Sequence, residues 1–150
     1  MRNNIETNYL IFISSDGKKS GFEIFNERLQ ENKWPIYNKT PQLQNVAEGK
    51  NIIFYIAGGG EKRQSFVGSA KIKSIIDNKN TTADTNQELK QVLFYVEVKE
   101  IKIFDKDLMI KEHIDNLDFI ENKEKYGLYF QGGICKINKE SFEYIKSKSS

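Results

Sequence analysis

The sequence predicts an α+β domain built on a small, curled, mixed β-sheet with flanking helices. Two observations carry this prediction. Strongly apolar, strand-like runs are interspersed with capped helical segments, and one long strand near the middle changes the face on which its apolar residues lie. A change of face inside a strand indicates a β-bulge, which bends a sheet toward a barrel. The length of 150 residues suits one core, so we expect a single domain over residues 1–150.

The first elements are a strand and a helix. Residues 8–14 are apolar at odd and even positions alike, as in a strand that is covered on both faces. Ser20 and Glu23 have the spacing of a capping box, and the apolar residues that follow recur at helical intervals. Residues 32–49 contain both prolines and the single tryptophan but show no period, which predicts an ordered loop.

The next segments predict a hairpin. Residues 51–57 are a second apolar, strand-like run. Three glycines and a polar tip, residues 58–64, lead into an alternating strand over residues 65–75. The glycines are followed by Lys62, but a Gly-Lys-Ser/Thr sequence and a following helix are missing, which excludes a phosphate loop.

A polar connection, residues 77–87, separates this hairpin from the long strand. From Val92 to Val98 the apolar residues have even numbers, whereas Ile101 and Ile103 have odd numbers. The bulge is therefore expected between Val98 and Ile101, with both isoleucines facing the core.

The C-terminal part predicts short elements. Residues 108–120 mix helical and turn signals, and residues 127–137 suggest two short strands around a pair of glycines. Asn138 is placed to cap a final helix, with Glu140 in its first turn.

Composition excludes several classes of protein. Cys135 and His113 are the only residues of their kinds, so an internal disulfide, a zinc cluster and a Cys-His catalytic pair with a third group are excluded, and we expect no metal and no cofactor. The apolar runs are too short for a membrane helix, and residues 1–8 lack the apolar core of a signal peptide. We therefore expect a cytoplasmic protein without membrane association. The net charge of +2 is too small to identify a partner.

Seven segments follow one another in a familiar order: residues 9–13, 33–35, 48–50, 53–55, 66–68, 117–132 and 137–145. In this order and spacing they resemble the EVE domain family of the PUA-like barrel superfold, over essentially the whole chain. The resemblance implies a curled, mixed barrel of PUA-like type. It also implies that, like the related YTH and ASCH domains, the protein holds a nucleobase, often a modified one, in an aromatic pocket at the mouth of the barrel.

We expect five residues to line this base-binding pocket: Trp34, Pro35, Tyr55, Tyr126 and Phe130. Phe54 and Tyr55 face opposite sides of a strand, so at most one of them lines the pocket, and the reverse assignment with Phe54 stays open. An aromatic ring exposed at a cleft could stack on an extruded base and stabilise it by about 1–3 kcal/mol. The residues alone leave a second interpretation open, in which Trp34 is a buried core side chain beneath the loop. If the pocket interpretation holds, Trp34 borders the largest cavity and faces at least one of Tyr55, Tyr126 and Phe130.

Four basic residues are candidates for contact with a nucleic-acid backbone. Lys62 and Arg63 lie at the hairpin tip, and Lys71 and Lys73 could extend their surface along the next strand, although a solvated strand face is the commoner arrangement.

The function expected from these observations is a non-enzymatic recognition module that accepts a flipped, modified base of DNA or RNA, with no catalytic residues. The alternative is an ASCH-like hydrolase of a small modified nucleoside, which would need a lysine and a carboxylate in one cavity. A protein-interaction domain is a third possibility.

Overall fold

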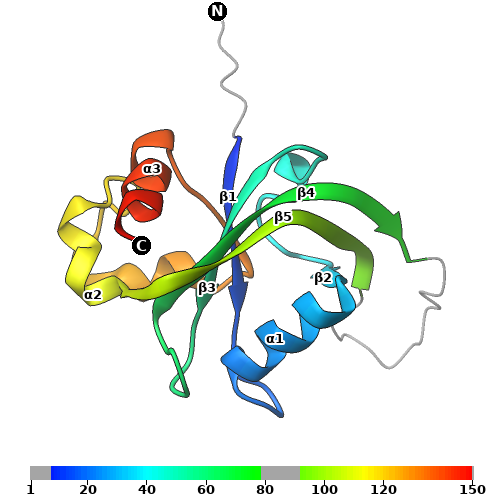
Figure 1. Ribbon diagram of the computed structural model, residues 1–150, viewed down its shortest axis with the longest axis horizontal. Coiled ribbons are helices and arrows are strands. Elements are labelled where there is room, and N and C mark those ends of the chain that lie inside the picture. Colours follow the sequence, from blue (N-terminus) through cyan, green and yellow to red (C-terminus); the bar gives the residue numbers. More distant parts are fainter. Residues whose placement is uncertain (1–7, 79–91, 150) are drawn as a thin grey trace, which may run out of the picture.

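The computed structural model describes residues 8–78 and 92–149 (Figure 1). Six strands form one sheet in the order β2-β5-β4-β3-β1-β6. The strands are β1 (Tyr9–Ser14), β2 (Trp34–Tyr37), β3 (Asn51–Ile56), β4 (Ser65–Asp77), β5 (Val92–Met109) and β6 (Ile134–Lys136). The helices are α1 (Gly21–Glu31), α2 (Ile110–His113) and α3 (Lys139–Lys148), with 3₁₀ helices η1 (Leu43–Asn45), η2 (Ile114–Asn116) and η3 (Lys123–Phe130).

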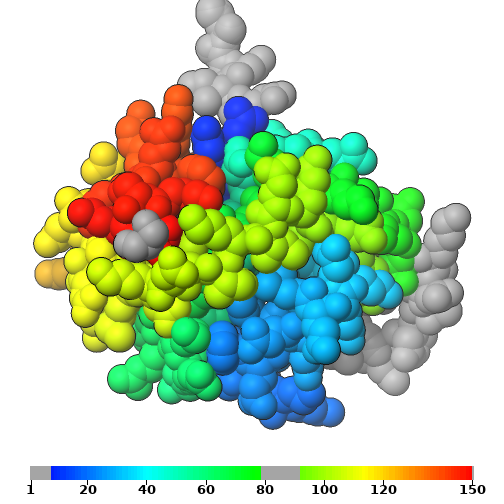
Figure 2. All heavy atoms as spheres, viewed as in Figure 1, coloured from blue at the N-terminus to red at the C-terminus, as the bar shows by residue number. Residues whose placement is uncertain are grey.

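The sheet is mixed, as predicted. β1 runs parallel to β3, and the other neighbouring strands are antiparallel. β4 and β5 form a long curved pair across the molecule, with α1 on one side and α2 and α3 on the other (Figures 1 and 2). This curled half-barrel leaves β2 and β6 as its two edges.

The predicted first strand and helix are confirmed. The Ser20 hydroxyl accepts a hydrogen bond from the Glu23 amide at 3.2 Å, and the Glu23 carboxylate accepts one from the Ser20 amide at 3.2 Å. These two bonds satisfy amides that have no partner inside the helix. α1 ends at Asn32, which has the left-handed backbone conformation.

The predicted loop over residues 32–49 is wrong in one segment, because Trp34–Tyr37 form the edge strand β2. β2 pairs with β5 through partners such as Trp34 and Val96, far away in the sequence. Pro35 has no amide to donate, and an edge strand tolerates it because only one side of the strand is paired.

The predicted bulge in the long strand is confirmed. Ser69 pairs with Lys102 and Lys71 with Lys99, so β5 has one more residue than β4 in this interval, and Glu100 has a φ of 54°. The expected direction of the isoleucines is wrong: Ile101 is 41% exposed and Ile103 is 53% exposed. The apolar pattern misled because β5 contributes to one core before the bulge and to another core after it.

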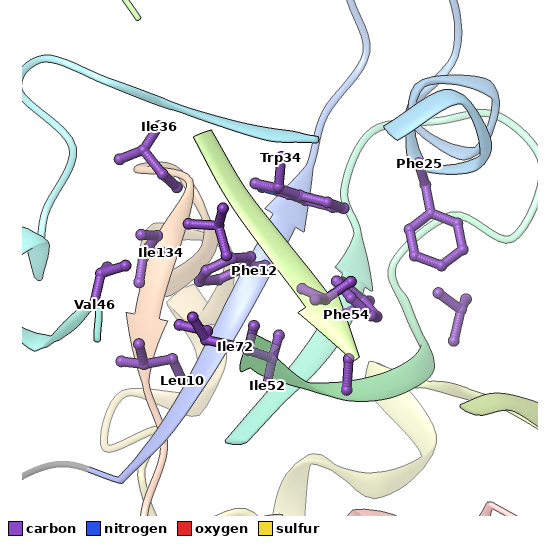
Figure 3. Close-up of a cluster of buried hydrophobic side chains, with 14 of the residues drawn as sticks. Leu10, Phe12, Phe25, Trp34, Ile36, Val46, Ile52, Phe54, Ile72 and Ile134 are labelled. Carbon is purple, nitrogen blue, oxygen red and sulfur yellow. The ribbon is translucent and has the colours of Figure 1, made fainter. Parts of the chain in front are cut away.

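These two cores lie on opposite faces of the sheet. The α1-side core, part of which is drawn in Figure 3, includes Leu10, Phe12, Phe25, Trp34, Ile36, Phe54, Val96, Val98 and Ile134. The α3-side core includes Ile11, Ile13, Tyr55, Phe66, Phe104, Leu108, Leu117, Phe130 and Ile145. β1 contributes alternate residues to both cores, which explains why it is apolar at odd and even positions.

The C-terminal prediction is correct for the last helix and wrong before it. The Asn138 side chain accepts a hydrogen bond from the Ser141 amide at 3.2 Å at the start of α3. In place of two strands over residues 127–137, η3 ends at Phe130 and only β6 is a strand. Gly133 has a φ of 93° in the connection between them, a conformation that favours glycine.

Most of the predicted connection over residues 77–87 lies outside the described residues. In the described part of the chain, no helix is both long and apolar enough to cross a membrane.

Candidate functional site

A cavity of about 440 Å³ lies at the opening of the half-barrel, and we call it the edge cavity. The two edge strands flank it because the sheet does not close there. It is lined by Ile13, Ser15, Asp16 and Gly17, by Ile24 and Arg28 of α1, and by residues 34–40 and 131–134. Its volume is in the range of small-molecule sites.

Trp34 borders this cavity, as expected, but it is also a core residue. Its side chain is only 3% exposed, and its ring centroid lies 5.2 Å from that of Phe54 and 5.6 Å from that of Phe12 (Figure 3). The Arg28 guanidinium carbon lies 4.8 Å from the centroid of the Trp34 ring. The core interpretation of Trp34 is therefore confirmed, and the expectation of an exposed ring is wrong, although the α1-side core that contains Trp34 forms a wall of the edge cavity.

Three charged residues line the edge cavity, Asp16, Arg28 and Lys39, and the first two have shifted pKa values. Burial lowers the pKa of Arg28, and the charge interaction and hydrogen bond with Tyr37 oppose that shift. An arginine guanidinium stays charged at neutral pH. The Asp16 carboxylate accepts hydrogen bonds from the amides of Gly21 at 2.9 Å and Gly59 at 3.0 Å. These bonds, the one from Gly59 foremost, lower the pKa of Asp16 below its ordinary value of 3.8. The cavity thus offers a cation and an anion to a ligand at neutral pH.

The Asp16 contacts predict a pH-dependent stability. Because the folded pKa is lower than the unfolded one, the carboxylate stabilises the fold above the unfolded value of 3.8, and this contribution is lost as pH falls through the folded pKa. Asp16→Asn should therefore lower the Tm near pH 6, and its difference from wild type should shrink near pH 3. Exposed Asp118, replaced by Asn, is the control. A difference that stays constant with pH would contradict the role given to Asp16.

A second cavity of about 350 Å³, the tyrosine cavity, lies next to the first. It is lined by Ser15, Tyr55, Ala57, Gly58, Gln64, Tyr126, Gly127, Phe130 and Gln131. Tyr55 is 2% exposed and stacks on Phe130, with ring centroids 4.1 Å apart and ring planes 17° apart. The Tyr126 hydroxyl donates a hydrogen bond to Gln64 Oε1 at 2.9 Å. Burial, with a smaller contribution from Tyr126, raises the pKa of Tyr55, so its hydroxyl stays protonated.

The structure divides the five predicted pocket residues between these cavities. Trp34 and Pro35 line the edge cavity, whereas Tyr55, Tyr126 and Phe130 line the tyrosine cavity. The expectation that Trp34 faces one of those three rings across a single cavity is therefore wrong. The reason is the sheet itself: Trp34 packs in the α1-side core, and Tyr55 and Phe130 pack in the α3-side core. Ser15 and Gln131 line both cavities.

The four basic residues do not form one surface patch. The Lys62 ammonium pairs with Asp107 at 2.7 Å, and Arg63 is exposed beside it. Lys71 lies 4.0 Å from Glu100, and Lys73 is exposed further along β4. Ser65 and Lys71 are six residues apart on this strand, which corresponds to about 20 Å. Lys62 and Arg63 are therefore near the end of β4 where Gln64 lines the tyrosine cavity, and the other two are not.

Sequence reasoning missed several residues that line the cavities: Ser15, Asp16, Arg28 and Gln131. Asp16 carried a usable signal, because it lies in the loop that follows an apolar strand and precedes a helix cap, where functional residues are frequent. Arg28 is one of three arginines, but nothing in its local sequence shows that its helix faces an opening. Among residues 8–78 and 92–149, no group of three His, Cys, Asp or Glu residues could hold a metal ion.

Comparison with known proteins places this geometry in a family. The UPF0310 protein of Mycobacterium avium (strain 104) is 27% identical over 145 residues, covering 94% of this chain and 96% of that protein. Human THYN1, solved in complex with DNA containing 5-methylcytosine, superposes with a TM-score of 0.59 at 14% identity, over 95% of this chain and 97% of that one.

The ASCH protein of Zymomonas mobilis superposes with a TM-score of 0.57 at 14% identity, over 96% of this chain and 97% of that one. These similarities show a PUA-like fold. The sequence profile of the EVE domain family matches residues 8–148, which is nearly the whole chain. The chain belongs to the EVE domain family.

Proposed function

We propose that this protein binds nucleic acid and holds one flipped, modified nucleobase in the edge cavity. The observation that carries the proposal is the cavity of about 440 Å³ between the two edge strands, which joins an aromatic wall to charged and polar groups. Flipping a base costs a few kcal/mol, which contacts with the base face and hydrogen bonds to its edge can offset. The DNA with 5-methylcytosine bound by human THYN1, a protein of the same fold, supports this class of ligand.

The walls of the edge cavity suit both the apolar face and the polar edge of a base. Pro35 and Tyr37 are half-buried and offer apolar surface beside the nearly covered Trp34. Arg28 can donate hydrogen bonds to carbonyl and ring-nitrogen acceptors of the base edge, and the loop around Asp16 offers further polar groups. The site is therefore suited to a planar group with polar edges.

The binding test is a matched panel of DNA and RNA oligonucleotides. Each pair differs by one modification, beginning with 5-methylcytosine against cytosine, and affinities are measured by fluorescence anisotropy at one fixed salt concentration. We expect a preference of about tenfold or more for at least one modified base. Equal affinities for the modified and plain member of every pair would refute the proposal.

The alternative of a hydrolase has one observation in its favour, since Asp16 and Lys39 both line the edge cavity. However, the Asp16 carboxylate already accepts two backbone hydrogen bonds and its pKa is lowered, which makes it a weak general base. We therefore favour binding. Incubation with modified nucleosides separates the two functions: release of a free base or of a deaminated or deacylated product would support the hydrolase.

Contact of the hairpin tip with the nucleic-acid backbone predicts a salt effect. Arg63 is exposed, and it has no ion pair among the described residues. Arg63→Gln should weaken binding to all oligonucleotides alike and flatten the plot of log affinity against log salt by about one unit.

Lys73→Gln is the matched comparison, because Lys73 is exposed at the distant end of β4. A similar loss there would show that the contact extends along β4 to Lys71 and Lys73. If Arg63→Gln weakened binding only to oligonucleotides with one particular modification, a contact between Arg63 and the nucleic-acid backbone would be contradicted.

A further inference from the structure

We infer that the tyrosine cavity is a second nucleobase site, which takes the unmodified base next to the flipped one. This inference rests on the proposed function of the edge cavity. Ser15 and Gln131 line both cavities, so the two sites share a wall. A strand that places one base in the edge cavity therefore passes the mouth of the tyrosine cavity with its neighbouring nucleotide.

The chemistry of the walls identifies the class of ligand. None of the nine residues that line the tyrosine cavity carries a charge at neutral pH, whereas Asp16, Arg28 and Lys39 line the edge cavity. A phosphate or carboxylate would lose its hydration there without a compensating cation. Three aromatic residues, two glutamines and a serine suit a neutral, planar group with hydrogen-bonding edges.

One residue of this site, Tyr55, has a hydroxyl group that no protein group in the described chain uses. Tyr55 is 2% exposed and lines the cavity, yet its hydroxyl has no hydrogen-bond partner among residues 8–78 and 92–149. Among the described residues, Ser141 Oγ is the only fully buried side-chain polar atom without a partner, so the Tyr55 hydroxyl keeps contact with solvent and a ligand in the cavity can reach it. The neighbouring Tyr126 donates to Gln64 Oε1, which leaves the Gln64 amide nitrogen as a further donor.

Gly127 keeps the wall of this cavity open. Its φ lies outside the left-handed range, so the backbone does not require glycine, and a Cβ built there would meet no atom within 4 Å. Gly58 in the same wall is different, because its φ is 95° and a Cβ would lie 2.4 Å from the Asp16 carboxyl. Packing within the described residues therefore does not require glycine at position 127, and the open space beside it leaves room for a ligand.

A positive charge next to the tyrosine cavity also suits a nucleotide. Arg63 precedes Gln64 directly in the sequence and is exposed. A nucleotide whose base lies in the uncharged cavity can therefore place its phosphate toward this guanidinium.

The test uses single-stranded oligonucleotides that carry the preferred modified base and an abasic site on its 5′ side, its 3′ side or neither. For the wild type we expect an affinity loss of about tenfold when one of the two neighbours is abasic. In Gly127→Phe the added ring fills the cavity, so the same abasic site should cost less than about twofold. Gln30→Phe is the control, because Gln30 is exposed on α1 and lines neither cavity.

A second pair of variants isolates the hydroxyl. Tyr55→Phe keeps the ring that stacks on Phe130 and should weaken binding about threefold or more only when the neighbouring base is present. Tyr9→Phe is the control: it removes the same hydroxyl group, but Tyr9 lines neither cavity, so affinity should stay unchanged. An equal abasic penalty in wild type and Gly127→Phe, or no penalty on either side, would refute the second site. If the wild type does not prefer any modified base, the proposed function itself fails, which is a separate result.

Discussion

Trp34→Ala should lower the free energy of unfolding by about 3–5 kcal/mol, the range for removal of a buried large aromatic side chain. Trp34 is 3% exposed and contacts the rings of Phe12, Phe25 and Phe54, so its loss leaves a void in the α1-side core. It also removes the ring beneath the Arg28 guanidinium. Urea denaturation followed by circular dichroism measures the change.

Leu128→Ala is the control for this experiment, because Leu128 is 61% exposed and its loss should cost less than about 0.5 kcal/mol. A loss below about 1 kcal/mol for Trp34→Ala would show that the ring is not held in the core. The residues alone left both interpretations of Trp34 open, and the resemblance to the EVE domain family favoured a ring exposed at the pocket and hence a small loss of stability. The burial of Trp34 reverses that expectation, and it makes Trp34→Ala a poor test of binding.

Gly17→Phe should reduce the affinity for the preferred modified oligonucleotide at least about tenfold while the protein stays folded. Gly17 lines the edge cavity, and a Cβ there would contact only Ile24 Cδ1 at an ordinary 3.8 Å. Its φ lies outside the left-handed range, so a side chain causes no backbone strain. The added ring therefore competes with a bound base without disturbing the core.

Gln30→Phe adds the same ring at an exposed position of α1 that lines neither cavity, and it should keep full affinity and selectivity. Gly127→Phe, in the wall of the tyrosine cavity, should keep the preference for the modified base. If Gly17→Phe binds as tightly and selectively as wild type while its Tm is unchanged, the base is not in the edge cavity.

The elements that local sequence determines were predictable. The capping box of Ser20 and Glu23 and the Asn138 cap depend on residues within one helical turn, so their spacing was sufficient. The bulge near Glu100 was predictable because an extra residue shifts the apolar pattern of the strand.

Features that depend on distant partners were not predictable. β2 is a strand because β5 pairs with it, and Trp34 is about sixty residues from its partner Val96. Trp34 and Tyr55 lie on opposite faces of the sheet, on strands β2 and β3, which are separated by β5 and β4. Which residues of these distant strands share a face depends on long-range pairing, which the local sequence does not reveal. The sequence could therefore indicate the aromatic residues of the candidate site, but not their division between two cavities.

The edge-cavity proposal can be tested directly through Trp34, the single tryptophan of the chain, which borders that cavity. An oligonucleotide with one modified base is titrated into the protein, and tryptophan emission and oligonucleotide anisotropy are recorded together. The proposal predicts a saturable change in emission at one base per protein, with the same midpoint as the anisotropy, in wild type and Gln30→Phe but not in Gly17→Phe. Binding by anisotropy with no change in Trp34 emission, or an unaltered change in Gly17→Phe, would contradict it.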